Sequence, residues 1–172
     1  MLQTIPDSKA IFYIGVDDKT IDLFESQYSV PNGVSYNSYV IQDEKLAIMD
    51  TVDPAATEQW MENLMEVLGD RQPDYLIISH MEPDHGASIE EVLLRYPDVT
   101  IISTEKSFML MRQFGFAVDS HPLMEVKEGD SISFGKHTVQ FIAAPMVHWP
   151  EVMVSFDSTD GVLFSADAFG TF

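Results

Sequence analysis

The sequence contains no cysteine and few basic residues. These two features limit the kinds of metal site and the kinds of partner that the protein can have. Without cysteine the chain supplies no disulfide bond, no thiolate zinc site and no iron–sulfur cluster ligand. Any metal ion that it binds must therefore be held by nitrogen and oxygen. Its 9 lysines and arginines stand against 28 aspartates and glutamates, a formal net charge of −19. Such a negative field repels nucleic acids and anionic membrane surfaces, so we expect neither as a partner.

Long hydrophobic runs are lacking as well. Nowhere do about 18 apolar residues occur together, and the N-terminus has no basic segment followed by an apolar one. We therefore expect a cytoplasmic protein without a membrane span. With 172 residues and 45% hydrophobic content, the chain is long enough for one domain with a substantial core.

Strand signals dominate both ends of the chain, and helix and strand signals alternate in its middle. Apolar stripes with helical spacing predict helices from Asp53 to Gly69, from Ser88 to Tyr96 and from Thr104 to Phe114. The pair Ser88 and Glu91 has the spacing of a capping box. The predicted strands are 10–16, 20–25, 34–42, 46–50, 75–79, 99–103, 131–134, 137–143, 152–156 and 162–165. This order indicates an α/β (α+β) domain with a mixed sheet.

Side chains that bind metals are concentrated in one short segment. His80, Glu82, Asp84 and His85 occupy four of six consecutive positions, directly after the predicted strand 75–79. Along an irregular turn, this spacing can direct two ligands to one cation and two to its neighbour. Carboxylates suit such a binuclear site because they offset the repulsion between two closely spaced dications.

Two further candidate ligands, His148 and Asp167, also follow predicted strands. Taken alone, each would more often be a hydrogen-bonded or solvated side chain than a ligand. Three loops at strand ends nevertheless present candidates, and open α/β sheets place their sites there. His121 and His137 lie beside a proline and a turn, and we assign them no metal-binding role.

The ligand motif resembles that of the flavodiiron proteins, also called A-type flavoproteins, in their metallo-β-lactamase-like domain. The matching residues are His80, Glu82, Asp84, His85, His148 and Asp167. The segment 33–39, GVSYNSY, is similar to that family too. The resemblance covers essentially all of residues 1–172, which would be the N-terminal part of the di-iron domain, without the flavodoxin-like domain. It implies an αββα sandwich, incomplete at its C-terminus, with two metals at the sheet edges.

The resemblance also implies which side chain binds which metal ion. It assigns one iron to His80, Glu82 and His148, the other to Asp84 and His85, and the bridge between them to Asp167. Glu82 stands where hydrolases of the superfamily usually carry histidine, and a hard carboxylate favours iron over zinc. The family's last histidine ligand lies beyond residue 172, which leaves the second iron one ligand short.

The activity implied by the resemblance is reduction of dioxygen to water, of nitric oxide to nitrous oxide, or of both. The implied cofactors are two non-haem iron ions and, in the assembled protein, FMN as the electron source. Rubredoxin or a flavin domain would be the redox donor, and the assembly would be a head-to-tail dimer.

The end of the sequence, 168–172, is apolar and directly follows a predicted core strand. An exposed apolar face or strand edge there would need a cover, so we expect a second polypeptide to complete the fold. Two alternatives stay open: a di-zinc metallo-hydrolase of the same fold, and a non-catalytic, truncated metal-binding domain.

Overall fold

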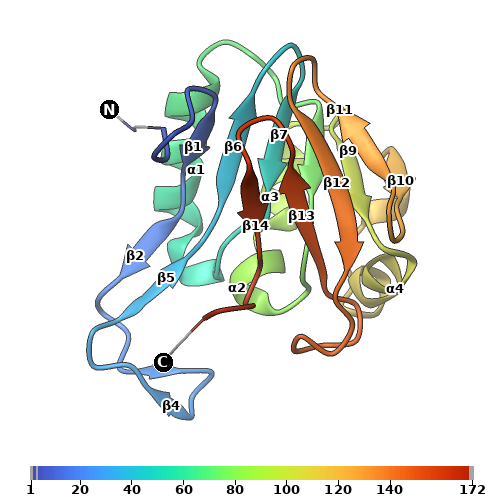
Figure 1. Cartoon of the computed structure of the whole chain (residues 1–172). Helices are drawn as coiled ribbons and strands as arrows, with labels where there is room; N and C mark the ends of the chain where they lie inside the picture. The colour runs from blue at the N-terminus through green and yellow to red at the C-terminus, as the bar shows by residue number, and fades with distance from the viewer. Residues whose placement is uncertain (1, 3, 171–172) are drawn as a thin grey trace.

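A six-stranded mixed sheet forms the centre of the computed structural model, which describes residue 2 and residues 4–170 (Figure 1). Its strand order is β1-β6-β7-β8-β9-β10. The bounds are β1 Ile11–Tyr13, β6 Tyr39–Gln42, β7 Leu46–Met49, β8 Tyr75–Ile77, β9 Thr100–Ser103 and β10 Leu123–Glu125. Neighbours from β7 to β10 are parallel, whereas β1, β6 and β7 pair antiparallel. The predicted mixed sheet is therefore confirmed, with β10 as a strand that the sequence did not predict.

A second, four-stranded antiparallel sheet packs against the first. Its strands follow the order of the sequence: β11 Ser131–Ser133, β12 Thr138–Ala143, β13 Met153–Asp157 and β14 Val162–Phe164. One hydrophobic cluster fills the space between the sheets, and it includes Ile11, Ile41, Met49, Ile77, Phe134, Phe141, Met153 and Phe164. Burial of these side chains is the main favourable term that holds the two sheets together.

Three helices cover the other face of the six-stranded sheet: α1 Thr57–Leu68, α3 Ile89–Arg95 and α4 Glu105–Gln113 (Figure 1). Successive side chains of a strand point to opposite faces, and β7 shows the result. Leu46 and Ile48 belong to the core beneath the helices, whereas Ala47 and Met49 belong to the core between the sheets. The short elements are η1 Pro54–Ala56, α2 Pro83–Gly86 and η2 Val118–Ser120. No helix in the described part of the chain is long and apolar enough to cross a membrane.

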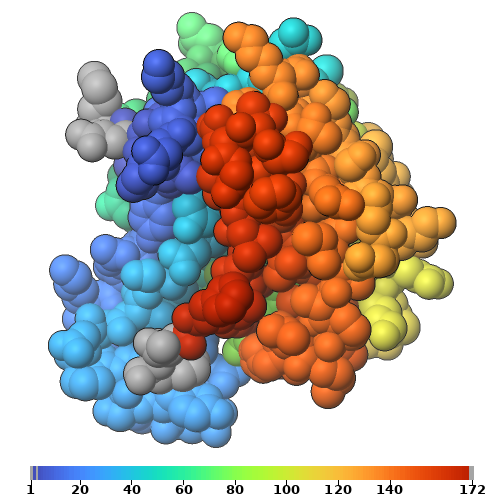
Figure 2. Space-filling model, in the orientation of Figure 1, coloured from blue at the N-terminus to red at the C-terminus, as the bar shows by residue number. Residues whose placement is uncertain are grey.

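The outer face of the four-stranded sheet carries no helix among residues 4–170 (Figure 1), and Figure 2 shows the surface of this face from the same side. Gln140, Phe156 and Leu163 are cross-strand partners on this face, and Leu163 is 44% exposed. The layers are thus helix, sheet and sheet. They match the predicted sandwich of the metallo-β-lactamase-like fold, with its second helical layer incomplete.

An arm of two small sheets projects from the main sheet and reaches the level of α2 (Figure 1). It consists of β2 Val16–Asp18 with β5 Val34–Tyr36, and β3 Leu23–Phe24 with β4 Tyr28–Ser29. Gly33 supports the turn before β5, because its φ is +81° and a Cβ there would overlap the carbonyl oxygen of Asp18.

Two sequence predictions were wrong in detail. The strands predicted at 10–16 and 34–42 are each broken in two, because the chain leaves the six-stranded sheet to pair β2 with β5. Ser88 makes no side-chain cap of α3. Its buried hydroxyl instead donates to the carbonyl of Val52 at 3.0 Å, which ties α3 to the segment after β7.

Candidate metal centre

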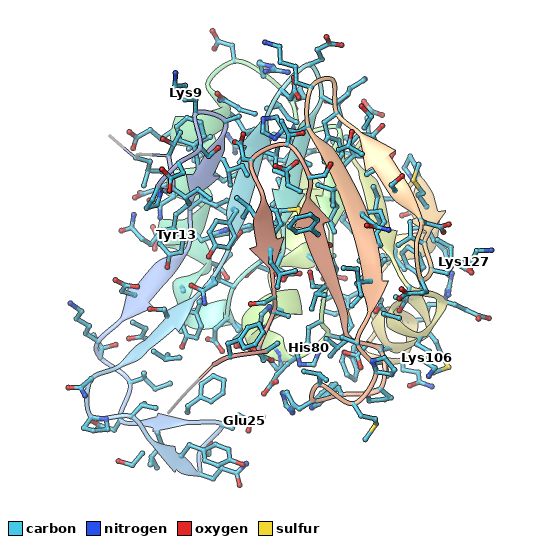
Figure 3. All side chains as sticks on the ribbon, in the orientation of Figure 1. Lys9, Tyr13, Glu25, His80, Lys106 and Lys127 are labelled. Carbon is cyan, nitrogen blue, oxygen red and sulfur yellow. The ribbon has the colours of Figure 1, made fainter. Side chains whose placement is uncertain are left out.

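Four candidate ligands from three loops converge beyond the ends of β8, β12 and β14. Figure 3 labels one of them, His80, among the side chains at this end of the sandwich. They are His80, Glu82, His148 and Asp167, and one ligand atom of each lies within 4.8 Å of the others. Glu82 Oε2 lies 3.1 Å from His80 Nε2 and 2.7 Å from His148 Nε2. Ligands that each lie about 2.0–2.2 Å from one metal ion are separated by distances of this order. The four side chains are therefore spaced to surround one cation.

A second group lies immediately beside the first and consists of Asp84, His85 and again Asp167. The single turn of α2 carries Asp84 and His85 on adjacent positions. His85 Nε2 lies 2.9 Å from Asp167 Oδ1 and 3.6 Å from Asp84 Oδ2. The structure thus brings all six predicted residues together in two adjoining groups, as their spacing had suggested. Metal binding by these residues stays a prediction.

Asp167 belongs to both groups because its two oxygens face different ways. Oδ1 faces His85, while Oδ2 lies 3.3 Å from His80 Nε2 and 3.4 Å from His148 Nε2. Asp167 Oδ2 and Asp84 Oδ1 are both buried without a hydrogen-bond donor among the described residues. A buried carboxylate oxygen with no donor is costly, and a cation would satisfy it. The donor set therefore fits a pair of metal ions bridged by one carboxylate.

Glu151, which was not predicted as part of the site, orients His80. It is 1% exposed, and its Oε1 lies 2.7 Å from His80 Nδ1 and accepts the N–H of Met81 at 3.0 Å. This contact leaves Nε2 of His80 free to face the ligand group. A carboxylate behind a ligating histidine fixes the ring orientation and raises its basicity.

Asp50, at the end of β7, plays the matching part for His85. Its Oδ2 lies 3.2 Å from His85 Nδ1, and its Oδ1 accepts the N–H of Ser79 at 2.6 Å. Asp50 was also missed as a site residue. The signal in the sequence was its place directly after an apolar strand, the same kind of place that identified His80 and Asp167.

The pKa values of the site reflect crowding of imidazoles and carboxylates. Burial lowers the pKa of His80, but hydrogen bonds with Glu151 and Glu82 outweigh burial and raise that pKa to about 9. The hydrogen bond from His80 is the main cause that lowers the pKa of Glu82 to about 2. Burial raises the pKa of Asp84 to about 6. Protons on the imidazoles therefore offset the carboxylates in the metal-free protein, and a binding metal ion must displace them.

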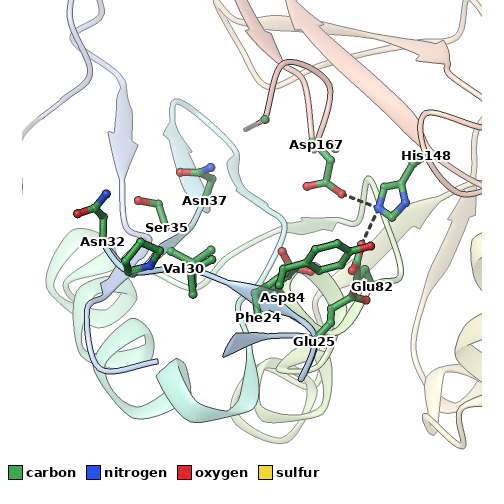
Figure 4. Close-up of a pocket in the computed structure, with 16 residues that line it drawn as sticks. Phe24, Glu25, Val30, Asn32, Ser35, Asn37, Glu82, Asp84, His148 and Asp167 are labelled. Carbon is green, nitrogen blue, oxygen red and sulfur yellow. Dashed lines mark hydrogen bonds and ion pairs between the residues drawn. The ribbon is translucent and has the colours of Figure 1, made fainter. Parts of the chain in front are cut away.

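A cavity of about 620 Å³ opens over the first group. Figure 4 shows Glu82, His148 and Asp167 on one side of it, and Asn32 and Asn37 of the arm on the other. His148 is more accessible than its neighbours, since its side chain is 55% exposed. Solvent therefore reaches the first group at His148, through an opening that the arm partly covers.

At the edge of this cavity, Glu25 from the arm lies against Glu82. The hydrogen bond that the two carboxyl groups share raises the pKa of Glu25. The arm therefore brings a carboxyl group into contact with a predicted metal ligand.

Fold and site together define a metallo-β-lactamase-like protein with a candidate binuclear centre built only from imidazoles and carboxylates. The family described as ODP family beta lactamase matches residues 34–172. The chain belongs to this family, and its predicted relationship to the flavodiiron proteins is confirmed by the comparisons that follow.

Among curated relatives, the putative diflavin flavoprotein A 1 of Thermosynechococcus vestitus is 33% identical over 99% of this chain and 29% of its own length. A nitric oxide reductase of Moorella thermoacetica is 32% identical over 99% of this chain and 43% of its own length. This chain therefore spans well under half of either relative.

Solved structures agree on the fold. A variant of the flavo di-iron protein of Thermotoga maritima superposes with a TM-score of 0.88 at 27% identity, covering 100% of this chain and 42% of that one. Rubredoxin oxygen:oxidoreductase of Desulfovibrio gigas gives 0.83 at 28% identity, covering 92% of this chain and 39% of that one. The predicted fold class is confirmed.

Proposed function

We propose that this chain is the metal-binding part of a di-iron oxidoreductase that reduces dioxygen to water, nitric oxide to nitrous oxide, or both. One iron would be held by His80, Glu82 and His148, the other by Asp84 and His85, and Asp167 would bridge them. The position of Asp167 carries this proposal, because one carboxylate contacts the imidazoles of both groups. When bound, a ferrous pair supplies one electron from each ion to a diatomic molecule.

Two observations support iron rather than zinc. Three of the six predicted ligands are carboxylates, and Glu82 in particular brings a hard oxygen into a position between two imidazoles. The relatives are named as a nitric oxide reductase and as a rubredoxin oxygen:oxidoreductase, which are redox enzymes. A hydrolytic di-zinc centre has no comparable support in the site.

The residues of this chain would orient the ligands, hold protons and admit the substrate. Glu151 and Asp50 fix the rings of His80 and His85 through Nδ1, so that Nε2 of each ring faces the centre. The cavity is ample for a diatomic substrate. The hydrogen bond with Glu82 raises the pKa of Glu25, and both reductions consume protons, so we propose Glu25 as a proton-transfer group at the cavity.

The rest of the machinery would come from outside residues 1–172. We propose a flavodoxin-like domain with FMN, a head-to-tail dimer that brings the flavin of one subunit near the iron of another, and rubredoxin or a flavin domain as donor. The second ligand group offers one donor fewer than the first, and we propose that an outside histidine supplies it. We also propose that the protein works in the cytoplasm.

Electron counting gives a direct test. Two ferrous ions carry two electrons, which is what two nitric oxide molecules and two protons need to form one nitrous oxide and one water. Anaerobic mixing of the ferrous-loaded chain with nitric oxide should therefore give nitrous oxide in a single turnover without flavin, measured by gas chromatography.

Zinc-loaded protein is the matched control, because it has the same ligands and no available electron. Failure of iron to bind, or release of nitrous oxide by the zinc form, would contradict the proposal. Hydrolysis of a chromogenic ester by the zinc form alone would favour the hydrolase instead.

A further inference from the structure

Another group of potential metal ligands lies at the end of the sandwich opposite α2 (Figure 1). His137 comes from the β11–β12 turn, Asp157 ends β13, and Asp160 lies in the turn that follows it. One ligand atom of each lies within 4.8 Å of the others. None of them contacts the candidate centre at His80, so any site here is a separate one.

Asp157, a member of this group, carries a buried and unsatisfied oxygen. Its side chain is 0% exposed, and its Oδ2 lies 3.2 Å from His137 Nδ1 and accepts the N–H of Asp160 at 2.8 Å. Oδ1 of the same carboxylate is buried with no hydrogen-bond donor among the described residues. A carboxylate oxygen in this state costs free energy that a cation would recover.

Basic side chains do not compensate the two aspartates. Within residues 4–170 the ion pairs of lysine or arginine are Lys45 with Asp74 and Arg112 with Asp119. Among the described side chains, His137 is therefore the ion-pair partner of Asp157, and Asp160 has no basic partner within 4.0 Å. Two carboxylates and a neutral imidazole carry a charge of −2, which one dication would neutralise.

Neighbouring segments hold the three side chains in place from outside the group. Asp43, between β6 and β7, accepts the backbone N–H groups of Lys136 and His137 through Oδ2, each at 2.7 Å. Ser8, ahead of β1, donates to Asp160 Oδ2 at 2.6 Å. Four segments that lie far apart in the sequence therefore meet here, and the geometry does not depend on one flexible loop.

We propose that His137, Asp157 and Asp160 bind a single divalent cation of the zinc class, with water completing its coordination. One nitrogen and two oxygens are a ligand set that zinc accepts, and three protein ligands plus water is a common arrangement. The cation would fasten the β11–β12 turn to the β13–β14 turn at the end of the sandwich remote from the reaction. This site is independent of the proposed oxidoreductase activity.

The test is a titration of the whole chain with Zn²⁺, followed by the imidazole ¹⁵N resonances of its histidines. We expect the His137 resonances to move on zinc binding, while those of half-buried His121 stay in place. Asp160→Asn should raise the zinc dissociation constant at His137 by at least about tenfold and leave the response of His148 unchanged. Asp98→Asn removes an equal charge from an exposed turn and should change neither.

Unchanged His137 resonances at zinc concentrations that shift His148 would overturn the proposal, and would mean a plain imidazole–carboxylate pair. The same holds if Asp160→Asn binds zinc at His137 as tightly as the unaltered chain. The titration of the unaltered chain decides the first point by itself, so it does not depend on whether a variant folds.

Discussion

The two halves of the candidate metal centre are built to different degrees of completion by this chain. The His80 half has four ligand atoms within reach of one another, whereas the His85 half has three, one of them the shared Asp167. Each half has its own buried carboxylate behind the histidine, Glu151 in one and Asp50 in the other. Each half therefore has one histidine held by a buried carboxylate, whereas the His80 half offers one more ligand atom than the His85 half. We expect the His80 half to bind metal first and more tightly.

The change with the largest expected effect is Asp167→Ala, because it removes the ligand that both halves share. We expect both metal ions to be lost, so that iron content after anaerobic loading falls from about two per chain to well below one. Elemental analysis by mass spectrometry measures this. Asp98→Ala, on an exposed turn, is the control and should keep the metal content of the unaltered chain. Full iron content in Asp167→Ala would show that Asp167 does not bridge the two metal ions.

The second largest effect is expected in the pH dependence of metal affinity in the His80 half. Contacts with Glu151 and Glu82 outweigh burial and hold the pKa of His80 at about 9, so its proton competes with the metal below that pH. Affinity of the His80 half for Co²⁺ should therefore rise as pH increases from 7 to 9, by up to about a hundredfold. Competition with a chelator at each pH measures it. An affinity that does not change over this interval would show that His80 loses no proton on binding.

A matched pair of substitutions tests the orienting carboxylates. Glu151→Gln should weaken metal binding in the His80 half by about 10–100-fold, and Asp50→Asn should do the same in the His85 half. Cobalt absorption spectra, recorded while the metal is added stepwise, distinguish the first binding step from the second. If each substitution weakened both metal-binding steps equally, the two halves would not bind their metal ions independently.

The smallest effect is expected from Ser38→Ala, which acts behind Asp50. Ser38 Oγ accepts the indole N–H of Trp60 at 3.0 Å and donates to the carbonyl of Asp50 at 2.8 Å. Its loss leaves a buried donor unpaired, so the free energy of unfolding should fall by about 1–3 kcal/mol. Urea unfolding measures this, with exposed Ser133→Ala as the control. If the free energy of unfolding falls no more than in the control, these two hydrogen bonds of Ser38 contribute little to stability.

Much of the site could be predicted because its residues follow apolar strands. His80 and Asp167 each lie three residues past the ends of β8 and β14, and parallel or packed strands bring such positions to one edge. Glu151 and Asp50 were missed for a physical reason. Glu151 lies 71 positions from His80 and Asp50 lies 35 positions from His85, so the local sequence does not pair either carboxylate with its histidine.

In the fold, too, features set by the local sequence were predicted, whereas features set by contacts distant in the sequence were not. Asp53 accepts the N–H of Ala55 and caps η1, which leads into α1 at Thr57, and α1 ends before Gly69 as its sequence pattern predicted. The breaks in the strands predicted at 10–16 and 34–42 depend on the pairing of β2 with β5, which no local pattern indicates. Ser88 had the spacing of a cap, yet its hydroxyl binds the Val52 carbonyl because tertiary packing places that acceptor within reach.

Whether these six side chains bind two iron ions is tested most sharply by iron anomalous diffraction from crystals of the anaerobically loaded chain. We predict two peaks, one among His80, Glu82 and His148 and one beside Asp84 and His85, with the carboxylate of Asp167 between them. A single iron peak away from Asp167, or no iron among these side chains, would contradict a di-iron centre bridged by Asp167.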